Sequence, residues 1–81
     1  MSESRSVVLY SRSRCHLCDE ARRVIEAERA RAEFPFREVL VDDVEELERA
    51  YGTRVPVVTV DGREEFEFAV DPVRLRALVR A

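Results

Sequence analysis

The sequence lacks the apolar segments that membrane-spanning or secreted proteins carry. No window of about 18 residues is both apolar and free of charge, so we expect no membrane span and no membrane partner. Residues 1–14 also lack the long apolar run of a secretory signal. Together these absences predict a cytoplasmic protein, in which cysteines are kept reduced.

The sequence also lacks lysine and has no excess of positive charge. Its formal net charge is −3, which argues against a nucleic acid as partner. All 14 basic residues are arginine, a residue that suits surfaces binding phosphate or carboxylate groups. The arginines are interleaved with glutamates, however, as on a solvent-exposed helix face. A codon bias toward arginine explains them better than a binding surface does.

With only 81 residues, the chain has room for one domain and a small core. A chain of this size buries about 60% of the surface that its unfolded form exposes. A long ligand tunnel or a cleft between two domains is therefore excluded. The hydrophobic share of 46% and the charged share of 38% are typical of a globular domain, so we expect residues 1–81 to form a single one.

Apolar periodicity and turn residues predict seven secondary-structure elements. Strands are expected at residues 6–10, 36–41, 57–60 and 64–68, and helices at residues 15–32, at residues 44–51 and after Asp71. The order is β-α-β-α-β-β-α, which indicates an α/β fold. The first two strands should be parallel, because a helix connects them, and the last two should form a hairpin at Asp61-Gly62.

Individual residues of these elements carry further expectations. Asp42 or Asp43 can cap the second helix, which should close at Gly52, a residue that tolerates the left-handed conformation of a helix cap. Phe66 and Phe68 alternate with glutamates, which predicts a half-buried edge strand. Leu17 falls at helical spacing with the other apolar residues of the first helix.

Cys15 and Cys18 lie at the junction of the first strand and the first helix. The unpaired N–H groups and the positive end of the helix dipole stabilise negative charge there, so a thiolate forms more readily at Cys15 than at a free cysteine. Cys18 is one turn away on the same face, within reach of Cys15. This spacing allows Cys15 to attack a disulfide and Cys18 to resolve the mixed intermediate.

Other interpretations of the cysteine pair remain open at this stage. A zinc site normally needs four protein ligands, and the chain offers two cysteines and one histidine, so a metal site would need a second subunit. Two inert, buried cysteines or a purely structural disulfide are further alternatives. A Cys-x-x-Cys motif next to a β-α-β pattern nevertheless favours redox chemistry. We therefore assign no residue as a metal ligand.

Charged residues around the pair could assist it. His16 could favour the thiolate when protonated, or it could be a solvent-exposed residue without a role. Arg12 and Arg14 precede the pair, and Arg54 lies in a second loop. All three are candidates for binding a substrate carboxylate, and ordinary loop charges are the alternative.

The segment Val55-Pro56 stands at the start of a strand, where proline donates no ladder hydrogen bond. It could simply mark the entry to the strand. It could also form a cis peptide that leaves the Val55 backbone free to pair with an extended substrate. From the residues alone cis is the minority expectation, because about 5–6% of X–Pro bonds are cis.

Two motifs resemble those of the glutaredoxins. Val8-Leu9-Tyr10-Ser11 followed by Cys15-x-x-Cys18 is similar to their opening, and Val55-Pro56-Val57-Val58 before Asp61-Gly62 is similar to their later strand and hairpin. Cys-x-Leu-Cys-Asp-Glu-Ala with Tyr-Gly-x-x-Val-Pro-Val resembles a branch of small bacterial glutaredoxin-like proteins.

The resemblance implies a thioredoxin-like fold with a central four-stranded mixed sheet and flanking helices. It also implies that Cys15 is the nucleophile, that Cys18 is the resolving thiol and that Val55-Pro56 is a cis peptide facing the sulfurs. Two departures bear on the substrate. His16 and Leu17 replace the usual Pro-Tyr, and Ala69-Val70-Asp71-Pro72 replaces a Gly-Gly-x-Asp stretch that holds glutathione.

We therefore expect a thiol–disulfide oxidoreductase that reduces or exchanges protein or glutathione mixed disulfides. Asp71 corresponds to the acid of the glutathione-binding stretch and is expected to bind substrate. No tightly bound cofactor is expected, glutathione is a candidate co-substrate, and an unidentified reductase is a candidate partner. The alternative is a thioredoxin-fold binding module that carries an iron–sulfur cluster or zinc at a dimer interface.

Overall fold

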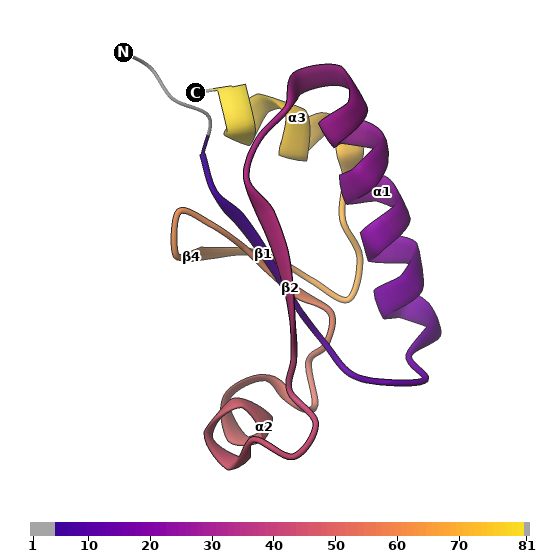
Figure 1. Cartoon of the computed structure of the whole chain (residues 1–81), viewed down its shortest axis with the longest axis vertical. Helices are drawn as coiled ribbons and strands as arrows, with labels where there is room; N and C mark the ends of the chain where they lie inside the picture. The colour runs from indigo at the N-terminus through magenta and orange to yellow at the C-terminus, as the bar shows by residue number, and fades with distance from the viewer. Residues whose placement is uncertain (1–4, 81) are drawn as a thin grey trace.

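The elements follow one another in the predicted order, β-α-β-α-β-β-α. The structure is a computed structural model that describes residues 5–80 (Figure 1). Its strands are β1 (Val7–Ser11), β2 (Phe36–Leu40), β3 (Val57–Val60) and β4 (Arg63–Glu67). Its helices are α1 (His16–Ala32), α2 (Glu45–Tyr51) and α3 (Pro72–Arg80).

The four strands form one mixed sheet in the order β2-β1-β3-β4. Strand β1 pairs with β2 in parallel and with β3 antiparallel, so that Leu9 lies between Glu38 and Val58. Strands β3 and β4 form the predicted hairpin, whose turn residues Asp61 and Gly62 both have positive φ. The fold class and the strand directions expected from the sequence are thus confirmed. The sequence did not predict the order of the strands in the sheet.

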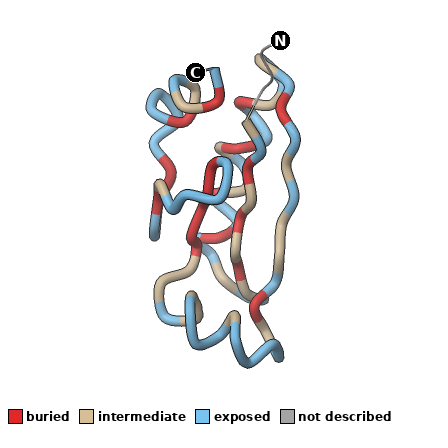
Figure 2. The backbone as a smooth tube through the Cα atoms, turned by 90° about the vertical axis from the view of Figure 1, so that its left-hand side faces the viewer, coloured by how far each residue is buried: buried red, intermediate tan, exposed pale blue. Residues whose placement is uncertain are grey.

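The hydrophobic core lies between the sheet and the two helices α1 and α3. It contains side chains from the central strands and from both helices, among them Val7, Leu9, Val58, Val60, Ala21, Ile25, Leu75 and Val79. Helix α2 lies beyond one end of the sheet in Figure 1 and contains no buried residue. Figure 2 shows the buried stretches along the strands and mainly exposed backbone at α2. Strand β1 is paired on both sides, so its end is held in place. The cysteine loop therefore starts from a fixed position.

The two ends of α2 differ from what the sequence led us to expect. Neither Asp42 nor Asp43 caps α2: the N-cap is Val44, which makes no side-chain cap hydrogen bond, because Asp42 is bonded elsewhere. Helix α2 does close at Gly52, which is its C-cap, but the φ of Gly52 is −54° and thus not left-handed. Glycine is needed there for space, because a Cβ atom would lie 2.5 Å from the backbone oxygen of Glu48.

Phe68 and Leu17 also lie differently from what the patterns predicted. Strand β4 ends at Glu67, and Phe68 follows it, exposed to solvent, with a φ of 69°. Its backbone N–H donates to the carbonyl of Pro56, at 2.8 Å. Leu17 is on α1 but is exposed as well, whereas its neighbour Cys18 is completely buried.

Helices α1 and α3 are joined by a partly buried ion pair. The carboxylate of Glu28 on α1 accepts hydrogen bonds from Nε and Nη2 of Arg76 on α3, both at 2.9 Å. Glu28 is only 5% exposed. The two hydrogen bonds hold the pKa of Glu28 below its usual range, although burial acts in the opposite direction. The pair therefore stabilises the contact between the helices only while Glu28 is ionised.

We predict that Glu28→Gln lowers the free energy of unfolding at pH 7 by about 1–3 kcal/mol, the range for a lost charge-assisted hydrogen bond. Because the folded-state pKa of Glu28 is depressed, its contribution is complete above the unfolded-state pKa and is lost as the pH falls through the folded-state value. The difference between variant and wild type should therefore shrink on acidification, as measured by urea unfolding over a pH series.

Glu45→Gln is the matched control, because Glu45 pairs with Arg49 on the exposed surface of α2. Such pairs contribute little, so this variant should unfold like the wild type. A loss in Glu28→Gln that stays constant down to the acid end of the series would contradict the assigned role of the ionised carboxylate.

Candidate active site

The two cysteines occupy the first turn of α1 and form a disulfide in this structure. Cys15 is the N-cap, its Cα atom lies 5.2 Å from that of Cys18, and its Sγ accepts a hydrogen bond from the Cys18 N–H at 3.1 Å. Cys15 is partly exposed, whereas Cys18 is completely buried. The prediction that the two sulfurs can reach each other is confirmed, and solvent reaches the first of them more readily.

The loop that leads into Cys15 is anchored by Asp42. Oδ2 of this residue accepts hydrogen bonds from the backbone N–H of Ser13, at 3.1 Å, and from its hydroxyl. These bonds, with a smaller contribution from the Arg12 guanidinium, hold the pKa of Asp42 below its usual range. Asp42 therefore positions the cysteine loop, a role that the sequence did not indicate because the two partners are far apart in the chain.

A second anchor joins the first turns of α1 to strand β2. Glu38 on β2 accepts hydrogen bonds from Nε and Nη2 of Arg22, at 2.7 and 2.6 Å, and from the Ser11 hydroxyl at 2.6 Å. The Arg22 bonds are the main reason why the pKa of Glu38 is lowered. Arg22 also bonds Asp19, directly after Cys18. The buried cysteine is thus followed by a turn of helix fixed to the sheet.

Two of the three arginines proposed for substrate binding already have partners within the chain. Arg12 donates to Glu48 on α2 at 2.7 Å. Arg54 donates to Glu64 and Glu67, at 3.0 and 2.8 Å, and its guanidinium lies over the ring of Tyr51. These contacts fix the loops around the site, and a role for Arg12 or Arg54 in binding substrate stays a prediction.

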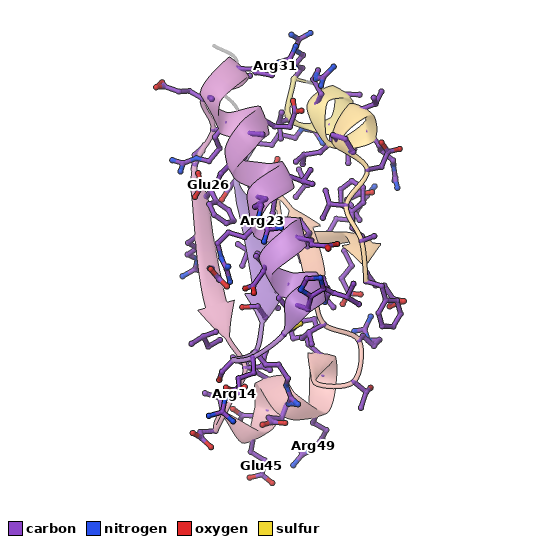
Figure 3. All side chains as sticks on the ribbon, turned by 90° about the vertical axis from the view of Figure 1, so that its right-hand side faces the viewer. Arg14, Arg23, Glu26, Arg31, Glu45 and Arg49 are labelled. Atoms are coloured by element: carbon purple, nitrogen blue, oxygen red, sulfur yellow. A yellow bond between two sulfur atoms is a disulfide. The ribbon has the colours of Figure 1, made fainter. Side chains whose placement is uncertain are left out.

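Arg14 differs from them. It is exposed, has a φ of 56° and immediately precedes Cys15. Figure 3 shows it near the start of α1, at the end of the molecule that also carries α2. Its position makes it the arginine best placed to meet a ligand at Cys15, and this role also stays a prediction.

His16 and Asp71 both have a local partner. The exposed imidazole of His16 has Nε2 at 3.0 Å from Oε2 of Glu20, four residues on. Asp71 caps α3, because its Oδ1 accepts a hydrogen bond from the Val73 N–H at 3.0 Å. The prediction that Asp71 opens the last helix is confirmed. Its predicted contact with substrate and the influence of His16 on the thiolate are not decided by these bonds.

The peptide bond between Val55 and Pro56 is cis, as the resemblance implied. Pro56 is fully buried, and its carbonyl accepts the N–H of Phe68. The segment thus connects the entry of β3 with the loop after β4. That it also faces the sulfurs and pairs with a substrate backbone stays a prediction.

Within residues 5–80, no group of three or more His, Cys, Asp or Glu side chains is arranged to hold a metal ion. None of the helices in this part of the chain is both long and apolar enough to cross a membrane.

The chain matches a known family over most of its length. The family described as "Glutaredoxin-like domain" matches residues 6–80. An X-ray structure of a structural-genomics target protein from X. campestris has 42% sequence identity and a TM-score of 0.74, covering 89% of this chain and 92% of that one. No protein with a curated function matches the chain significantly.

Two further solved structures share the fold. A protein from Nitrosomonas europaea, known from a solution NMR structure, is 28% identical with a TM-score of 0.82, over 98% of this chain and 95% of that one. A thioredoxin from Fasciola hepatica is 25% identical with a TM-score of 0.61, over 98% and 81% of the two chains. The predicted thioredoxin-like fold is therefore confirmed.

We predict that Asp42→Ala makes the Cys15–Cys18 disulfide easier to reduce, by roughly two- to tenfold in the equilibrium constant with glutathione, the worth of one net hydrogen bond. Without the anchor, Cys15 samples more positions in the reduced state, and the loss of a nearby negative charge favours its thiolate. Both effects act in the same direction. The ratio of dithiol to disulfide in graded redox buffers measures the change.

Glu45→Ala removes the same charge from the exposed surface of α2, three residues further on. It should leave the equilibrium constant at the wild-type value. Equal shifts in the two variants would show that only long-range charge matters and that the Ser13 contacts do not position the loop.

Proposed function

The chain belongs to the family of glutaredoxin-like domains, and we propose that it is a thiol–disulfide oxidoreductase acting through Cys15 and Cys18. The observation that carries the proposal is the cysteine pair itself: two sulfurs within bonding reach at the start of α1, one partly exposed and the other buried. A structural crosslink would not need this difference in exposure, whereas a two-step exchange does.

The difference in exposure supports the two roles. An attacking sulfur must meet the disulfide of another molecule, which favours the accessible Cys15 over the buried Cys18. The Cys15 sulfur also lies where a negative charge is stabilised, because it is at the helix N-terminus and accepts the Cys18 N–H. Cys18 is buried and within bonding reach of the Cys15 sulfur, which it attacks in the second step.

The reaction then proceeds in two exchanges. The Cys15 thiolate attacks one sulfur of a substrate disulfide, forming a mixed disulfide, and the other substrate sulfur leaves as a thiolate that takes up a proton. Cys18 loses its proton and attacks the Cys15 sulfur, which releases the second substrate thiol. The substrate has gained two electrons and two protons, and the protein holds the Cys15–Cys18 disulfide. A thiol or dithiol reductase returns it to the dithiol.

The disulfide of a protein is the proposed substrate ahead of glutathione. Side chains at Ala69 and Val70 stand where the resemblance would place glycines that bring the backbone close to glutathione. Val55 is proposed to pair with the extended substrate backbone, with Arg14 and Asp71 at the ends of the site. Glutathione remains the proposed small co-substrate, a dedicated reductase the proposed partner and the reducing cytoplasm the proposed compartment.

We predict that Cys15→Ser abolishes reduction of a model protein disulfide, because the attacking sulfur is lost. Cys18→Ser should instead accumulate the mixed disulfide between Cys15 and the substrate, since nothing resolves it. Intact-mass spectrometry under non-reducing conditions detects this adduct, and addition of a dithiol should remove it.

The double variant, with both cysteines replaced by serine, is the control and should carry no adduct. Equal loss of activity in the two single variants with no trapped adduct would contradict the assigned roles. An adduct trapped in Cys15→Ser in place of Cys18→Ser would reverse them.

A further inference from the structure

Two large apolar side chains that line the same groove are exposed to solvent. Leu17, between the cysteines in the chain, is 45% exposed, and Phe68, after strand β4, is 47% exposed. They line a shallow groove of about 90 Å³ between α1 and the segment that joins β4 to α3. Ala21, Val24 and Val70 complete its apolar wall. The groove has room for about three waters, or for one small apolar side chain.

The backbone at Phe68 is unfavourable for phenylalanine. The N–H of Ala69 donates to the carbonyl of Glu67 at 2.8 Å, so Phe68 is the central residue of a γ-turn, and its φ is 69°. This positive-φ form of the γ-turn is rare and strained, and a bulky side chain makes it more so. Glycine would occupy the position without that strain.

The fold therefore gives little reason for a phenylalanine at this position. The ring is half exposed, and the N–H bond to the Pro56 carbonyl that places the turn needs only the backbone. A residue that is both exposed and strained, and that shares a groove with Leu17 of the Cys-x-x-Cys motif, is more readily explained by what it binds than by what it stabilises.

The negative charge at the groove favours some classes of ligand over others. Glu20 is the one charged residue that lines it, with Oε2 at 3.0 Å from His16 Nε2. A carboxylate at the rim repels the two carboxylates of glutathione and accepts a neutral or basic peptide. The other lining residues are all apolar, so an aliphatic side chain fits the groove better than a polar one.

We propose that this groove binds an aliphatic side chain next to the cysteine of a protein disulfide, and that Phe68 determines this specificity. The inference rests on the proposed function, because the ligand is the segment joined to Cys15 in the mixed disulfide. Leu17 belongs to the same turn as Cys15, and Phe68 is bonded to Pro56, so the groove is continuous with the proposed exchange site.

The test uses two blocked tetrapeptides, each as its symmetric disulfide, with leucine or serine after the cysteine, and glutathione disulfide as a third substrate. The reduced wild-type protein should react with the leucine peptide about tenfold faster than with the serine peptide, a ratio within the range for an apolar pocket. In Phe68→Gly this ratio should fall close to one. In Glu20→Gln the rate with glutathione disulfide should rise.

Leu40→Ala is the matched control, because Leu40 is similarly exposed but lies at the end of β2, on the opposite edge of the sheet from β4. It should keep the wild-type ratio. The melting temperature separates binding from folding: Phe68→Gly should melt no lower than the wild type, since glycine relieves the positive-φ strain.

A lower melting temperature of Phe68→Gly would mean that the ring packs the fold, and would overturn the inference. So would a wild-type protein that reduces all three disulfides at equal rates, although the proposed function would then stand. A wild-type protein that reacts with none of them would overturn both.

Discussion

The first turn of α1 is held from two directions, and every property of the cysteine pair depends on where that turn lies. Below it, Ala21 and Ile25 pack into the core, and Arg22 is bonded to Glu38 of β2. Before it, Ser13 is bonded to Asp42. The helix and the loop can therefore not move apart freely, and Cys15 meets the N–H of Cys18 as a consequence.

Arginine in this small protein serves mainly to connect elements. Arg22 joins α1 to β2, Arg76 joins α3 to α1, and Arg54 joins the loop before β3 to β4. In each case the planar guanidinium donates hydrogen bonds to a carboxylate of another element. Such links between elements add to the limited stability that a core of this size provides. The interleaving of arginine and glutamate in the sequence thus corresponds to pairs within the fold.

The sequence predicted what depends on local pattern and missed what depends on distant partners. The elements, the hairpin at Asp61 and the start of α1 follow from periodicity and turn chemistry. Asp42 was expected to cap α2, but Ser13, in another loop, takes its carboxylate. The alternation that placed Phe68 on a strand continues in the sequence after the strand has ended. The Phe68 N–H still donates to the Pro56 carbonyl in the register of the ladder, but Pro56 has no N–H to donate in return, and the φ of Phe68 is 69°. Neither partner is visible from neighbouring residues.

The central claim is that Cys15 and Cys18 form a redox-active pair. Intact-mass spectrometry of the wild-type protein, after equilibration in graded glutathione redox buffers and acid quenching, tests it most directly. The account predicts a reversible change between the dithiol and a form lighter by two hydrogens, with both present at intermediate buffers. A protein that stays in one state across the whole range, from whichever side equilibrium is approached, would contradict the claim.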